Sequence, residues 1–396
     1  MDDEEARTIG RRVRQIRYAR QKSLRVIAGL AGMSSNMLWR IETGQRALDS
    51  LSETTALANA LQVSPSELRW LPAPAPADDE GPAMTAVRRG LKAVSRHRPD
   101  GQVLPVEALR TRVAALVAAQ GLDADHERVG RELPALIRDL HSSIAAGRDV
   151  AELLDLAVVL HTRGSQAWLK VMSAPVDLRS QATLLARQAA EHRDEPTAMG
   201  LAVWGDALVM LAEGDFDLAR DTLGLVTVPT STSEGMQLAG MLALCQSLVA
   251  AADKRPADIE AALDHAGELA ARTGECNAWN LGFGPTNVGL WRMAATLEVG
   301  DHECAATIAD GLNPQEHPSR ERRAAYWVNY GRALARLRGR QDAAVMAFRR
   351  AETISSRHML RNPFARDVLA EMVAHSRRDA VGRELRGMAY RAGLPV

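Results

Sequence analysis

The chain has 396 residues, which is enough for two or three domains of ordinary size and excludes a short disulfide-stapled fold. Its 49 Lys and Arg balance 49 Asp and Glu, so the net charge gives no argument for binding to nucleic acid or a membrane. Any basic patch must therefore be local. Three widely separated Cys without C-x-x-C spacing fit a reducing compartment and no structural zinc.

Neither a secretory signal nor a membrane span is expected. The first residues are acidic rather than cationic, and the best apolar run, residues 153–160, is far shorter than the roughly 20 residues that cross a bilayer. We therefore expect a soluble, cytoplasmic protein with no membrane partner.

Almost the whole chain has the three-to-four spacing of amphipathic helices, which predicts an all-α fold. One segment interrupts it, because alternating Pro and Ala between residues 71 and 82 keep the chain extended. We place a domain at residues 1–71, a linker at 72–101 that contains a possible helix at 83–94, and a helical body at 102–396.

The first domain holds a local basic patch and a pair of short helices. Residues 7–46 contain ten Lys or Arg and one acid, Glu42. Ser23 can cap the first short helix, Gly32 suits the left-handed turn that follows it, Ser34 can cap the second, and Gly44 can end it. This spacing predicts a helix-turn-helix, whose second helix enters the DNA major groove.

This segment resembles the Cro-type, xenobiotic-response-element family of regulators, over about residues 7–71. The shared motifs are Ile9-Gly10, Arg17, Ile27-Ala28, Gly32-Met33-Ser34, the run from Arg40 to Gly44, Leu57-Ala58, the run from Leu61 to Pro65, and Leu68. The resemblance implies a five-helix, lambda-repressor-like domain in which Arg17 pairs with Glu42.

The resemblance also implies which residues contact DNA. Base-contacting positions fall on Ser35, Asn36 and Arg40, and Asn and Arg are side chains that read adenine and guanine. Trp39 lies on the same face, where it contacts bases or instead packs against the first helix or a partner subunit. Phosphate-contacting positions fall on Ser23, Thr43 and Arg46, whereas Leu24 stands where the family often has Gln. Ser34, the cap of the second helix, is also assigned to the DNA-binding set. Arg25 either contacts a phosphate or is a solvated side chain.

Internal repeats divide the body. Three segments share the pattern Gly-x-x-x-x-Ala, beginning at Gly214, Gly300 and Gly339, and a degenerate unit lies around residues 252–269. These repeats resemble tetratricopeptide units, which stack as helix pairs and line a concave groove with the first helix of each pair.

Candidate ligand residues come from this groove and from residues 278–291, which combine Trp, Phe, Asn and a Gly-Pro turn. Packing of a long interhelix turn is the alternative explanation of that segment. The candidates are Trp204, Leu208, Asn280, Phe283, Thr286, Asn287, Leu290, Trp291, Asn329 and Arg336. Their composition favours an apolar small molecule slightly over an acidic peptide.

Enzyme motifs are missing: the sequence has no H-E-x-x-H, no G-x-S-x-G, no phosphate loop and no metal-spaced His, so we expect no catalysis, metal or cofactor. A Cro-type domain joined to tetratricopeptide-like repeats resembles Gram-positive, including actinobacterial, transcription regulators. We therefore expect a nucleoid-associated homodimer that binds an inverted-repeat DNA operator and responds to a small-molecule or peptide effector. The alternative is a DNA-targeted scaffold whose repeats dock a partner protein.

Overall fold

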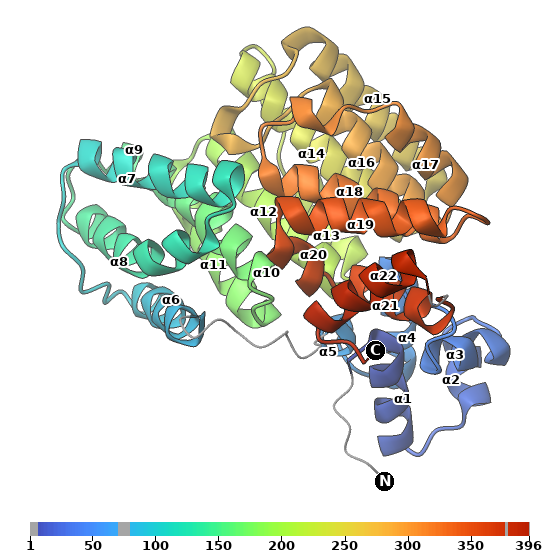
Figure 1. The fold of residues 1–396 in the computed structure, drawn as a ribbon. Coiled ribbons are helices and arrows are strands. Elements are labelled where there is room, and N and C mark those ends of the chain that lie inside the picture. The colour runs from blue at the N-terminus through green and yellow to red at the C-terminus, as the bar shows by residue number, and fades with distance from the viewer. Residues whose placement is uncertain (1–6, 70–79, 377–378, 396) are drawn as a thin grey trace.

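The computed structural model describes residues 7–69, 80–376 and 379–395, and over these ranges the chain is built from helices (Figure 1). Within the described ranges the one piece of β-pairing is a single bridge between Cys276 and Phe283. The predicted all-α fold is therefore confirmed. The Pro/Ala-rich segment falls mainly on residues 70–79, which lie outside the described residues.

The amino-terminal domain, called the head below, has the five helices that were predicted. They are α1 (Ile9–Ala19), α2 (Leu24–Leu30), α3 (Ser35–Glu42), α4 (Leu51–Leu61) and α5 (Pro65–Arg69). Ser23 and Ser34 cap α2 and α3 through hydroxyls that accept from the amides of Val26 and Met37. Between these helices Gly32 has φ of 68°, the left-handed conformation that its position predicted.

The first part of the body is a bundle. Its helices are α6 (Glu80–Ser95), α7 (Val106–Ala118), α8 (His126–Ala145), α9 (Val150–Val159), α10 (Ala167–Val171) and α11 (Val176–Arg193), with π-helical segments η1 (Ala119–Asp123) and η2 (Leu160–Gln166). Helix α6 corresponds to the helix expected in the linker. It buries Val87 and Leu91 in the body's main hydrophobic core and packs against α8.

Four helix hairpins follow, stacked side by side. They are α12 (Pro196–Glu213) with α13 (Phe216–Gly224), α14 (Ser233–Ala252) with α15 (Pro256–Thr273), α16 (Pro285–Glu298) with α17 (His302–Asp310), and α18 (Arg320–Ala335) with α19 (Gln341–Ile354). Short 3-10 turns η3 (Ala278–Asn280) and η4 (Pro314–Glu316) lie between them. Helices α20 (Ser356–Arg361), α21 (Pro363–Ala374) and α22 (Ala380–Arg391) complete the chain.

The repeated Gly and Ala have the same role in three hairpins. Gly214, Gly300 and Gly339 follow the first helix with φ between 75° and 87°, which lets the chain reverse without a Cβ clash. The matching alanines, Ala219, Ala305 and Ala344, are fully buried, so the two helices approach closely. In the degenerate unit Lys254 takes the left-handed position, with φ of 57°.

The body curls until its carboxyl-terminal helices meet its first bundle (Figure 1). Helix α18 contacts η1, and α20 contacts α10. Arg361 donates from Nη1 to the carbonyl of Met172 at 3.4 Å. The head lies against α21 at one end of this curl, and α5 also contacts α12. The curl therefore encloses a central space that the head borders.

Helix α14 is long and apolar enough to span a membrane by composition, but 78% of its apolar window is buried inside the fold. Such burial is what a core helix shows.

Gly240 on α14 provides a test of packing in this core. The ring of Phe283 is fully buried against it, and a Cβ added at residue 240 would lie 2.1 Å from Cζ of that ring. We expect Gly240→Ala to lower the free energy of unfolding by about 1 to 3 kcal/mol through overpacking. Gly267→Ala on α15 is the control, because nothing lies within 4 Å of its added Cβ. The control should be neutral or stabilising in urea unfolding, and equal effects of the two changes would contradict this packing.

Candidate DNA interface and ligand cavity

Helix α3 presents its predicted reading face to solvent. Four residues of α3 are exposed: Ser35, Asn36, Trp39 and Arg40. Ser35 lies one turn before Trp39, and Asn36 lies one turn before Arg40. Leu38 and Ile41 of the same helix are buried in the head's core. Trp39 keeps 46% of its surface exposed, so its indole is accessible beside Asn36 and Arg40. The structure therefore places the three predicted base-contacting residues and Trp39 on one free face.

A buried ion pair holds this helix against α1. The Nε and Nη2 atoms of Arg17 donate to the two carboxylate oxygens of Glu42 at 2.6 and 2.7 Å, and Arg17 also donates to the carbonyl of Lys22 at 3.0 Å. The hydrogen bonds that Arg17 donates to Glu42 raise the pKa of Arg17 against the opposing effect of burial. The pairing that the family resemblance implied is thus confirmed.

The predicted phosphate-contacting residues differ in their availability. Arg25 and Ser23 are exposed at the start of α2. Thr43 donates its hydroxyl to the carbonyl of Trp39 at 2.8 Å, and Ser34 is occupied as the cap of α3. Arg46 donates to Glu53 at 2.7 Å, so a phosphate would compete with an existing ion pair. Arg25 is the predicted phosphate-contacting Arg that remains available.

Residues 8–71 match a protein family described as a helix-turn-helix domain. No curated protein and no solved structure matches the chain. The head is therefore a helix-turn-helix DNA-binding domain, and this supports a DNA-binding regulator.

A cavity of about 630 Å³ lies in the middle of the curl. Its walls come from the first bundle, from the first helix of each hairpin, from α20 and α21, and from Leu51, Ser66 and Arg69 of the head. The π-helical segments also contribute, through Gln120, Gly121, Arg163 and Gln166. Such segments widen a helix by one residue and are frequent at functional sites.

Half of the predicted ligand residues line this cavity: Trp204, Leu208, Asn280, Trp291 and Asn329. The others lie elsewhere. Phe283 packs on Gly240, and Leu290 belongs to the carboxyl-terminal core. Thr286 donates its amide to Glu275 at 2.7 Å and its hydroxyl to Glu316 at 3.3 Å. Asn287 accepts from Arg322 at 2.9 Å behind the cavity wall. Arg336 pairs with Asp49 and Glu371 where the head meets the body.

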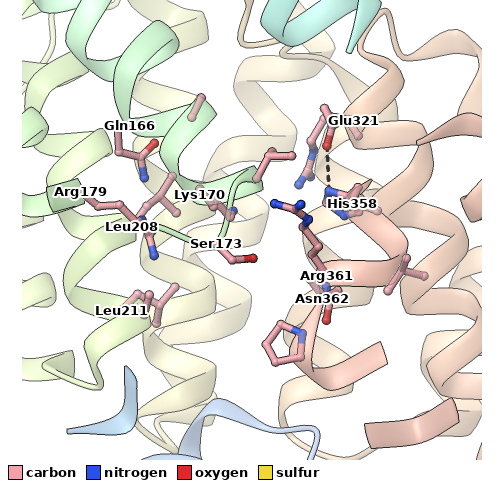
Figure 2. Close-up of a pocket in the computed structure, with 18 of the residues that line it drawn as sticks. Gln166, Lys170, Ser173, Arg179, Leu208, Leu211, Glu321, His358, Arg361 and Asn362 are labelled. Atoms are coloured by element: carbon pink, nitrogen blue, oxygen red, sulfur yellow. Dashed lines mark hydrogen bonds and ion pairs between the residues drawn. The ribbon is translucent and has the colours of Figure 1, made fainter. Parts of the chain in front are cut away.

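The Arg and Lys residues that line the cavity were not predicted from the sequence. The walls hold nine Arg and Lys and two Glu; the cations are Arg69, Arg163, Lys170, Arg179, Arg322, Arg332, Arg357, Arg361 and Arg366. Figure 2 shows Gln166, Lys170 and Arg179 on one side of the cavity, facing Glu321, His358 and Arg361 on the other. One sequence signal was present, since Lys170 is a lone charge in the apolar run from Ala167 to Met172.

These cations are poorly solvated. Burial lowers the pKa of Lys170 to about 8, assisted by repulsion from Arg179 and Arg322. Burial also lowers the pKa of Arg163, Arg179 and Arg322 to about 10, so all three remain charged at neutral pH. Lys170 is accessible to solvent within the cavity, but protein surrounds it closely enough to disfavour its charge.

Two cavity residues also hold the head in place. The carboxylate of Glu298 accepts from the amides of Leu51 and Ser52 at 2.9 and 2.8 Å, at the amino end of α4, where a negative charge is favoured. Arg332 donates from Nη2 to the carbonyl of Asp49. The wall of the cavity and the contacts that seat the head therefore share Glu298 and Arg332.

Proposed function

We propose that the protein is a sequence-specific transcription regulator that binds an inverted-repeat operator as a homodimer. A single helix-turn-helix reads one half-site, so two heads are needed for a palindromic operator. The exposed face of α3, with Asn36 and Arg40 in register, supports base reading. On this proposal the protein acts in the cytoplasm, at the nucleoid.

The body, in this proposal, is a tetratricopeptide-like sensor whose cavity binds a small-molecule or peptide effector. The observation that carries this role is the makeup of the cavity, which combines residues of the repeats with Leu51, Ser66 and Arg69 of the head. An effector that prefers one seating of the head over another shifts the population of DNA-competent dimers. Glu298 and Arg332 are the residues through which this preference acts.

The DNA-binding role is tested by first selecting bound fragments from a random DNA pool with the purified full-length protein. Enrichment of an inverted repeat, bound by two chains, is the expected result. Enrichment of no sequence, with or without cell extract as a source of effector, would contradict the proposed function.

On the selected operator, Asn36→Ala and Arg40→Ala should each cost about 1 to 3 kcal/mol and relax selectivity at one base pair of each half-site. Arg25→Ala is the comparison, because a lost phosphate contact weakens specific and random DNA alike and lowers the salt slope by about 1 for each lost contact. Fluorescence anisotropy at two salt concentrations measures both effects. Equal losses on operator and random DNA for all three variants would show that α3 does not read bases.

A further inference from the structure

The charge of the central cavity indicates the chemistry of its ligand. Nine Arg and Lys line it, against two Glu. Both carboxylates already have partners: Glu298 accepts from the amides of α4, and Glu321 accepts from Ser355 at 2.8 Å and pairs with His126 and His358. The partners of these two Glu do not include Lys170, Arg179 or Arg322.

Hydrogen-bond donors in the wall lack acceptors. Among the described residues, buried N–H groups without a partner include Nε of Arg179, Nε of Arg322, Nε2 of Gln166 and the indole nitrogens of Trp204 and Trp291. Each of these five residues lines the cavity. Arg179, Gln166, Trp204 and Trp291 are each more than nine-tenths buried. Buried donors without partners are unfavourable, so an acceptor group that reaches this wall is favoured.

The same cavity has an apolar wall. Leu208 and Leu211 of α12 and Leu248 of α14 contribute to it, together with Met241 and Val328. Leu208 and Leu211 lie on the same side as Arg179 in Figure 2. A ligand that satisfies both kinds of surface carries an anionic group and a hydrocarbon or aromatic body.

We propose that the cavity binds an organic oxyanion, with its phosphate, sulfonate or carboxylate group held by Lys170, Arg179 and Arg322 and its apolar body against Leu208, Leu211 and Leu248. This inference rests on the proposed effector-binding function and replaces the expectation of a chiefly apolar ligand. An anion is favoured because its charge offsets the repulsion among Lys170, Arg179 and Arg322. The volume of about 630 Å³ suits a small organic molecule.

The test uses the full-length protein with octyl phosphate as the probe and 1-octanol as its neutral match, measured by calorimetry. Octyl phosphate should bind at least tenfold more tightly than octanol. Lys170→Met and Arg179→Gln should each weaken the phosphate by tenfold or more and leave octanol unchanged. Arg272→Gln, an exposed change on α15 away from the cavity, is the charge-matched control and should alter neither.

A second readout does not depend on the probe. Without ligand, Lys170→Met and Arg179→Gln should raise the melting temperature, because each relieves the repulsion among Lys170, Arg179 and Arg322, whereas Arg272→Gln should not. Equal binding of octanol and octyl phosphate, or binding indifferent to both cavity variants, would overturn the anion inference and leave an effector site of other chemistry. If neither probe binds and the melting temperatures of the cavity variants are unchanged, the anion inference is overturned as well. Operator binding by the same preparations shows separately whether the regulator function stands.

Discussion

Replacing Arg17 with Met should destabilise the head by about 3 to 5 kcal/mol, because it leaves the carboxylate of Glu42 buried without its counter-charge. The two side chains are only 7% and 3% exposed, and both carboxylate oxygens accept from the guanidinium. The pair joins α1 to the last turn of the reading helix, so its loss also disturbs the position of Asn36 and Arg40. Amide hydrogen exchange in α1 and α3 of the full-length protein measures the effect, and operator binding should fall with it.

The double variant Arg17→Met, Glu42→Met is the matched control. Apolar side chains of similar length often replace a buried ion pair at little cost, so the double variant should recover most of the lost protection. If the double variant is as unstable as the single one, the pair does not act as an ion pair. If the single variant exchanges like the wild type, Glu42 is not held as a buried charge.

The head could be predicted almost completely from the sequence because its determinants are local. The caps at Ser23 and Ser34, the turn at Gly32 and the buried face around Ile41 all lie within about twenty residues. Short-range signals of this kind define helix ends without knowledge of the rest of the fold. The five-helix fold around this helix-turn-helix and the pairing of Arg17 with Glu42 came from the family resemblance.

The body was predictable in its hairpins and not in its cavity. Gly214, Gly300 and Gly339 identified the turns, while the hairpin with Lys254 in the left-handed position was harder to recognise because it lacks the glycine. The cavity depends on curling that brings α10 and α11 opposite α18 and α20, about 150 to 190 residues away along the chain. Lys170, Arg179 and Arg322 are ordinary helical cations until that closure surrounds them. Leu290, from the repeat pattern, and Phe283, from the aromatic segment at 278–291, are instead buried in the core.

The seating of the head on the body was also invisible in the sequence, and Asp367 is central to it. This carboxyl on α21 is 4% exposed and accepts from the amide of Ile9 at 2.7 Å and from that of Leu48 at 3.2 Å. Asp367→Ala should leave both amides unpaired, at about 1 to 3 kcal/mol for each amide that stays buried, and should release the head. Hydrogen exchange at Ile9 and Leu48 should rise, with the core of α14 unchanged. Unaltered protection at both amides would contradict this role.

The same carboxyl makes the seating of the head depend on pH. Burial raises the pKa of Asp367 from 3.8 to about 7, and the charge of Asp49 also raises it. The two amide hydrogen bonds and the charge of Arg366 oppose this increase. Release of the head exposes the carboxyl to water and returns the pKa toward 3.8, so seating takes up a proton between about pH 4 and 7. The protonated carboxyl of Asp367 therefore contributes fully to the stability of the seated head below pH 4. This contribution is lost as the pH rises through 7. Protection factors at Ile9 and Leu48 should therefore fall across this window.

Asp367→Asn separates the charge from the hydrogen bond, because its carbonyl oxygen still accepts from one of the two amides and its side chain does not titrate. Its seating should resemble that of the protonated wild type at low pH and should stay nearly independent of pH up to 8. The nearby ion pair between Arg336 and Glu371, at 2.6 Å, remains in both proteins and serves as an internal constant. A wild-type pH dependence that persists in Asp367→Asn would assign the titration to another group. On the proposed function, loss of this proton near neutral pH weakens the seating of the head that an effector would have to shift through Glu298 and Arg332.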